Sequence, residues 1–145
     1  MSTIATLAPD QALESILKDR ILVNVSADDV RVVPVYRQGG RPNNIVDEEF
    51  IEILNNGLIT AITKPLGIYK GHLAIVVYCK SFPDGTTKFG RIESIMAQLE
   101  NLVNFQVGLN TYFEIDYDNL ITPLTYDAES GYSMVVLNVE WHTTK

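Results

Sequence analysis

The chain has few of the residues that build disulfide frameworks and most enzyme sites. Its 145 residues include one cysteine, Cys79, and two histidines, His72 and His142. Because one cysteine cannot form an intramolecular disulfide, stability must come from packing. The low cysteine content is consistent with a reducing cytosol.

Long apolar runs are also lacking. No run approaches the ~20 residues that a membrane-spanning helix needs, and the longest candidate, residues 73–79, has the length of a β-strand. Residues 1–10 contain no basic stretch followed by a continuous apolar stretch, so no secretory signal is visible. We therefore expect no membrane partner.

Positive charge is scarce as well. The 11 Lys and Arg residues stand against 18 Asp and Glu residues, which gives a net charge of −7. The densest basic group, Arg31, Arg37 and Arg41, lies in a segment that also carries several aspartates. Since phosphate contacts need clustered Lys and Arg, this composition argues against a surface that binds nucleic acid tightly.

What the chain does contain is ordinary globular composition, with 46% hydrophobic and 20% charged residues. This length predicts one domain, residues 1–145, with a flexible N-terminus of about eight residues. Apolar spacing predicts a short helix at residues 9–20, which Pro9 opens, and a long amphipathic helix at residues 89–104. The predicted buried stripe of the long helix is Phe89, Ile92, Ile95, Met96, Leu99, Leu102 and Val103.

Four segments have the β-branched and aromatic composition that is typical of strands. They are residues 30–36, 71–80, 112–117 and 131–142. Pro34 cannot donate to a strand ladder, so the first is an edge strand or is interrupted there. The second is apolar on both alternating faces, as is typical of a central strand that is covered on both sides.

The segment around Asn55-Asn56-Gly57 allows two interpretations. Residues 50–54 and 58–63 flank an Asn-Gly pair, which is a strong signal for a hairpin turn. The alternative is a helix at residues 47–54 that Gly57 caps. We favour the hairpin, because the alternation before the turn and the β-branched run after it are typical of strands.

Together these elements predict a small single α+β domain. Its mixed or antiparallel sheet should have about five to six strands, packed by the long amphipathic helix and the short N-terminal helix.

No group of residues resembles a catalytic site. Cys79 ends an apolar strand without a recognisable base beside it, so we interpret it as a small buried side chain. Neither His72 nor His142 stands in a metal-ligand spacing with cysteine or the other histidine, and we interpret both as hydrogen-bonded or exposed. Phosphate-binding glycine loops and a Gly-x-Ser-x-Gly motif are absent from the sequence. We predict that the protein is not an enzyme and holds no cofactor.

One acidic patch lies near the C-terminus. Glu114, Asp116 and Asp118 alternate and should share one strand face, and Asp127 and Glu129 follow. A calcium site would use such oxygens, but the EF-hand loop pattern is missing. We interpret the patch as a solvated face or as the polar rim of a contact between subunits.

The order of elements resembles a known family. An apolar strand at residues 73–79 leads through a polar loop to the long helix and then to a Tyr-Phe-Glu-Ile strand at residues 112–115. The chain closes on Gly131-Tyr132-x-Met-Val-Val-Leu-x-Val-x-Trp. Over residues 10–142 this pattern resembles the tail-terminator, or tail-completion, proteins of long-tailed bacteriophages and prophages.

The resemblance implies a structural protein that forms a homo-oligomeric ring, typically a hexamer, on the tail tube. Such a ring stops tube polymerisation and joins the tail to the head, so the implied location is the virion tail or neck after assembly in the bacterial cytoplasm. The implied partners are copies of the chain, the tail-tube protein and a head-side connector protein. Six copies at −7 each would carry roughly −42, which would repel DNA that passes through without specific binding.

Loops on a rigid scaffold can reach neighbouring subunits, so we expect ring or tube contacts at residues 38–44 and 82–88. The expected interaction residues are Arg37, Arg41, Asp84, Lys88, Glu114, Asp116 and Asp118.

Two other functions stay open. One is another head–tail connector or neck component, which differs only in its neighbours. The second is a small-ligand-binding or enzymatic α+β domain that uses His72, Cys79 and the acidic patch. A deep pocket that gathers these groups would favour the second, and a flat packing surface would favour assembly.

Overall fold

The structure is a computed structural model. It describes residues 9–26, 28–38, 40, 48–63, 68–82, 86, 88–104, 106–108, 111–116, 125–127 and 130–144. The predicted flexible segment, residues 1–8, lies outside this part of the chain. The elements are α1 (Pro9–Leu17), β1 (Leu22–Ser26), β2 (Asp29–Val32), β3 (Val35–Arg37), β4 (Glu49–Thr63), β5 (Ile68–Lys80), α2 (Phe89–Val103), β6 (Gln106–Gly108), β7 (Thr111–Ile115), β8 (Thr125–Asp127) and β9 (Tyr132–Thr144).

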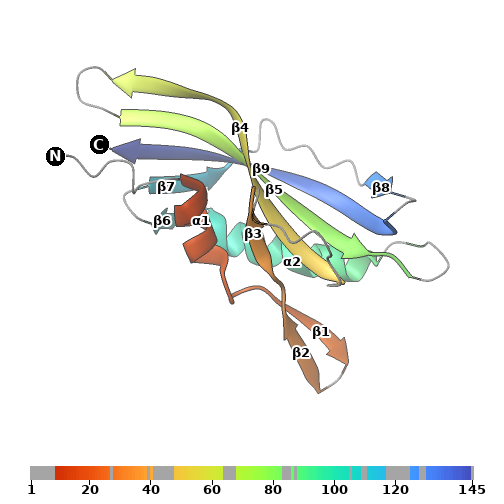
Figure 1. The fold of residues 1–145 in the computed structure, drawn as a ribbon. Helices are drawn as coiled ribbons and strands as arrows, with labels where there is room; N and C mark the ends of the chain where they lie inside the picture. Colours follow the sequence, from red (N-terminus) through yellow and green to blue (C-terminus); the bar gives the residue numbers. More distant parts are fainter. Residues whose placement is uncertain are drawn as a thin grey trace.

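The described strands form a seven-stranded sheet and a separate two-stranded sheet. The large sheet has the order β3-β4-β5-β9-β7-β6, and β8 also pairs with β9. β3 runs parallel to β4, and the other pairs are antiparallel. The predicted small α+β domain with a mixed sheet is confirmed, with more strands than expected. The long strands twist across one another, and the β1–β2 hairpin projects away from them (Figure 1).

One face of the large sheet packs against both helices. Leu73, Ile75 and Val77 of β5 are buried there, and their partners on β4 and β9 share that face because directly paired residues point the same way. Leu13 of α1 and Leu99 of α2 belong to the same core cluster. We call this the helix-covered face. In the described residues neither helix has the length and apolar character that a bilayer span requires.

The other face of the sheet, here called the opposite face, has an aromatic half. The rings of Phe50 and Tyr78 stack with centroids 4.3 Å apart. Tyr36 and Tyr132 pack edge-on against Phe50 at 6.2 and 5.4 Å. These four rings come from β3, β4, β5 and β9, so they connect four adjacent strands. β5 is therefore a central strand with buried residues on both faces, as its sequence predicts.

The predicted hairpin turn at Asn56-Gly57 is wrong. β4 runs continuously from Glu49 to Thr63 and pairs with β5 along its length. The pairing register shifts between Asn56 and Thr60, so the Asn-Gly pair lies at an irregularity of the ladder. The long partner strand outweighs the local turn preference, because it offers a ladder partner on both sides of the irregularity. The connection between β4 and β5, residues 64–67, lies outside the described residues.

The predicted strand at residues 30–36 is interrupted at Pro34, one of the two possibilities that the sequence allows. β2 ends at Val32 and β3 begins at Val35. Between them the Pro34 carbonyl accepts a hydrogen bond from the backbone N–H of Ile51 at 2.9 Å. β1, which the sequence analysis missed, pairs with β2 as an antiparallel hairpin.

Each helix differs from the sequence prediction in one respect, α1 in where it ends and α2 in the burial of its first residue. α1 ends at Leu17, earlier than predicted, and Asp19 follows with a φ of 62°, in the left-handed region where helices often stop. Phe89 is the first residue of α2 and is 61% exposed, so its predicted place in the buried stripe is wrong. The rest of that stripe is buried or partly buried.

Candidate interaction surfaces

The β1–β2 hairpin presents apolar side chains on its outer side. Leu22 pairs with Val32, and Asn24 pairs with Val30, so these four side chains share one face of the two-stranded sheet. Leu22, Val30 and Val32 are 43%, 54% and 42% exposed. Isolated exposed apolar residues are ordinary, but three on one small face form a patch that is typical of a contact surface.

The inner side of the hairpin is anchored to the domain. Val23 is buried in the core cluster. The side chain of Gln98 on α2 binds both backbone groups of Leu22, since its Oε1 accepts from the N–H at 2.9 Å and its Nε2 donates to the carbonyl at 2.8 Å. A two-stranded sheet is marginally stable alone, so these contacts set the position of the hairpin.

A buried carboxylate also ties the hairpin to α2. The side chain of Glu49 is 1% exposed and lies between two guanidinium groups. Arg31 of β2 donates to its Oε1, and Arg91 of α2 donates to its Oε2 at 2.8 Å. Buried carboxylates need such partners, because removing a charge from water is costly.

Glu48 extends this anchor toward solvent. Its carboxylate lies 3.2 Å from Arg31, 3.4 Å from Arg91 and 3.8 Å from Lys88. The hydrogen bond from Arg31 lowers the pKa of Glu48, and hydrogen bonds to the two carboxylates raise the pKa of Arg31. Both shifts favour the charged forms of Glu48 and Arg31.

The seven predicted interaction residues do not form one surface in the described part of the chain. Arg37 pairs with Glu14 of α1 at 3.4 Å, beside a cavity of about 360 Å³ that both residues line. Lys88 lies 5.2 Å from the centroid of the exposed Phe82 ring. Glu114 and Asp116 lie at β7, on the opposite face of the sheet. The remaining three, Arg41, Asp84 and Asp118, are outside the described residues.

Asp116 lies in a cluster with His72, which the sequence analysis combined with the acidic patch only in its alternative function, and with Glu140, which it did not single out. Oδ2 of Asp116 lies 3.5 Å from Nε2 of His72, and Oε2 of Glu140 lies 3.5 Å from the same nitrogen. His142 contacts the other oxygen of Glu140, with Nε2 3.3 Å from Oε1. His72, Asp116 and Glu140 could hold a metal ion, since each offers one ligand atom and these three atoms lie within 4.8 Å of one another.

Cys79 is separated from this cluster. It is buried on the helix-covered face, whereas His72 points to the opposite face of the same strand. Burial, aided by the nearby Glu49 carboxylate, raises the pKa of the Cys79 thiol to about 11. A site that combines His72 with Cys79 is therefore not formed, and the thiol is not activated.

Comparison with known proteins does not assign the chain to a protein family. No protein-family model matches the sequence, and no curated protein matches it significantly.

Proposed function

We propose that the protein is a structural subunit of a phage or prophage tail, which caps the tail tube as a homo-oligomeric ring and joins the tail to the head. The sequence resemblance over residues 10–142 supports this identity. The observation that carries the assembly proposal is the β1–β2 hairpin, whose outer side exposes Leu22, Val30 and Val32 while its inner side is fixed to the domain.

A fixed arm favours association, because less conformational freedom is lost when the partner binds. The hairpin is held by the Glu49 ion pairs and by the Gln98 hydrogen bonds, so its apolar face is already oriented. Because these two valines and the leucine are about half exposed, burying them would contribute roughly half of the 1.5–3 kcal/mol that full burial of each side chain gives, before the costs of association. Contact between the hairpin and a different surface of the next copy would be head-to-tail, the type of contact that closes rings.

The outer edge of β4 offers a second contact. β3 pairs with β4 only at residues 51–53. From Asn56 to Thr63 no described strand pairs with this edge. Free strand edges present backbone N–H and C=O groups that can add a strand from another chain. A neighbouring subunit could therefore add a strand to this edge of the sheet.

The proposal is tested in the phage or prophage that encodes the protein. Loss of the gene should give tail tubes that overgrow and fail to join heads, as seen by electron microscopy of lysates. The double variant Val30→Ser/Val32→Ser should give the same defect with a folded subunit. The matched control is Asn24→Ser, which changes the same face without removing apolar area, and it should give normal tails.

Two results would change the assignment. Tails of normal length with unjoined heads would indicate a head-side connector, the runner-up function. Normal tails joined to normal heads after gene loss would refute a role in tail completion.

A further inference from the structure

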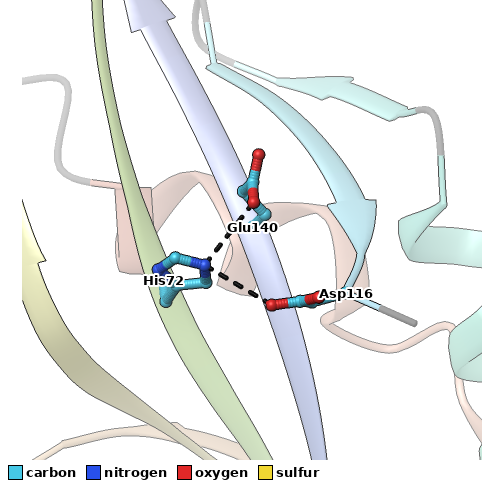
Figure 2. A group of neighbouring side chains, drawn as sticks. All are labelled: His72, Asp116 and Glu140. Carbon is cyan, nitrogen blue, oxygen red and sulfur yellow. Dashed lines mark ion pairs between the residues drawn. The ribbon is translucent and has the colours of Figure 1, made fainter. Parts of the chain in front are cut away.

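The opposite face of the sheet brings three metal-ligating side chains together from three neighbouring strands. Figure 2 shows His72 on β5, Glu140 on β9 and Asp116 at the end of β7, with the two carboxylates pointing toward the imidazole. We propose that His72, Asp116 and Glu140 bind a divalent transition-metal ion of the Zn²⁺ type. The site is independent of the ring proposal, since it rests on the geometry within one subunit.

The distances fit a shared ion better than direct hydrogen bonds. Both carboxylate oxygens lie 3.5 Å from Nε2 of His72, whereas a charged N–H···O hydrogen bond is shorter, at about 2.8 Å. Bonds of about 2.1 Å in a tetrahedral zinc site place neighbouring ligand atoms about 3.4 Å apart. The three ligand atoms already lie within 4.8 Å of one another, so small side-chain rotations complete the geometry.

The charge of the cluster also favours a cation. Asp116 and Glu140 place two carboxylates here, and the basic groups on the same face are the imidazoles of His72 and His142 and the side chain of Lys70, which pairs with His142 across β5 and β9. Glu114 adds a further carboxylate, since it pairs with Glu140 across β7 and β9 on the same face. The nearby His142 contacts the far oxygen of Glu140 and does not lie between the ligands. A divalent ion would balance the two ligating carboxylates.

The ligand atoms select the class of metal. Mg²⁺ and Ca²⁺ prefer sites made of oxygen alone, whereas imidazole nitrogen suits Zn²⁺ and related transition ions. Three protein ligands leave at least one coordination position, and the 34% exposed side chain of His72 shows that solvent reaches the site. Water can therefore complete the coordination.

The protein holds the ligands in place before any ion binds. His72 and Glu140 are directly paired in the β5–β9 ladder. The backbone N–H of Asp116 donates to the carbonyl of Asn138 at 3.0 Å, which fixes Asp116 beside β9. His142 lies 3.3 Å from Oε1 of Glu140 and orients its Oε2 toward His72. Such contacts behind the ligands are typical of metal sites.

The test is isothermal titration calorimetry of the metal-free full-length protein with ZnCl₂. The wild type should bind one Zn²⁺ per chain, with MgCl₂ and CaCl₂ binding much more weakly. Each of His72→Gln, Asp116→Asn and Glu140→Gln should lower the Zn²⁺ affinity at least about a hundredfold, because even residues behind a ligand contribute ten- to hundredfold. Glu52→Gln, a carboxylate on β4 that also points to the opposite face, is the matched control and should bind Zn²⁺ as the wild type does.

Two further measurements distinguish the loss of a ligand from unfolding and from metal binding at Cys79. Thermal melts without metal should show that the ligand variants are folded. The optical spectrum of the Co²⁺-loaded wild type should indicate nitrogen and oxygen ligands without a thiolate charge-transfer band, which excludes binding at Cys79. Absence of Zn²⁺ binding by the wild type would overturn the proposal. So would equal affinity in the wild type and all three ligand variants.

Discussion

The β1–β2 hairpin and the core beneath α2 are both rich in apolar side chains, but they use them differently. Leu99 and Ile95 of α2 are fully buried against the sheet. Leu22, Val30 and Val32 of the hairpin are 43%, 54% and 42% exposed. The first set stabilises the subunit, whereas the second set leaves apolar area available for a partner. The difference shows that apolar content alone does not distinguish a core from a contact surface.

The largest expected loss of stability follows from a substitution in the core beneath α2. Leu99→Ala removes a fully buried side chain from the centre of the α2 stripe. The loss of transfer free energy and the cavity that remains should lower the free energy of unfolding by about 2–5 kcal/mol. Chemical denaturation measures the change. A loss below about 0.5 kcal/mol, the range of surface substitutions, would show that Leu99 does not support the core.

The second-largest loss of stability is expected where the hairpin contacts α2. Glu49→Gln removes the buried charge that joins Arg31 of the hairpin to Arg91 of α2. Both arginines keep some contact with solvent, so we expect a loss of about 2 kcal/mol in denaturation. Hydrogen exchange of the β1 and β2 amides should also become faster than in the wild type. Unchanged exchange there would show that the ion pairs do not hold the hairpin.

A smaller effect concerns Cys79. Cys79→Ser places a hydroxyl in a buried position and should lower the free energy of unfolding by about 1 kcal/mol, without loss of the assembly proposed above. With a thiol pKa of about 11, the thiolate fraction at pH 8 is about one in a thousand. Labelling of the native protein with a thiol reagent should therefore be slow and should accelerate as the pH rises toward 11. Rapid labelling at neutral pH would contradict the buried, unactivated thiol.

The smallest effect on stability is expected in the hairpin. Val30→Ser/Val32→Ser changes two exposed side chains, so the free energy of unfolding should change by less than about 0.5 kcal/mol per site. Denaturation of this variant beside Leu99→Ala compares the two regions directly. A loss similar to that of Leu99→Ala would mean that these valines support the fold, and would remove the basis for an assembly surface.

The spacing of apolar residues in the sequence predicted those helices and strands whose burial can be read from their own residues alone. The period of α2 and the continuous apolar run of β5 gave their types and places correctly, because the first follows from the burial of one helix face and the second from the burial of both faces of a central strand. The Asn56-Gly57 turn failed, because pairing with β5 extends along the whole of β4. Phe89 failed because periodicity marks a helix face but does not show where that face loses its covering.

The candidate metal site could not be predicted from spacing. His72, Asp116 and Glu140 are far apart in sequence and meet through the pairing of β5, β9 and β7. Strand alternation predicts that Asp116 shares a face with Glu114, but the register between strands decides which residues meet. The hairpin anchor was also missed, since Glu49 looks like an ordinary surface carboxylate in sequence. In the structure it is buried beside Cys79 on the helix-covered face, where two arginines pair with its charge.

Sedimentation velocity of the purified protein over a wide concentration range tests the central claim, assembly through the hairpin, most directly. The account predicts weak association of the wild type, from single subunits toward a ring, as the concentration rises. In Val30→Ser/Val32→Ser the association should be weaker by roughly thirtyfold, since about 2 kcal/mol of apolar burial at two half-exposed valines is lost. Asn24→Ser should associate as the wild type does. Equal association of the wild type and the double variant, or a wild type that stays a single subunit at every concentration, would contradict the account.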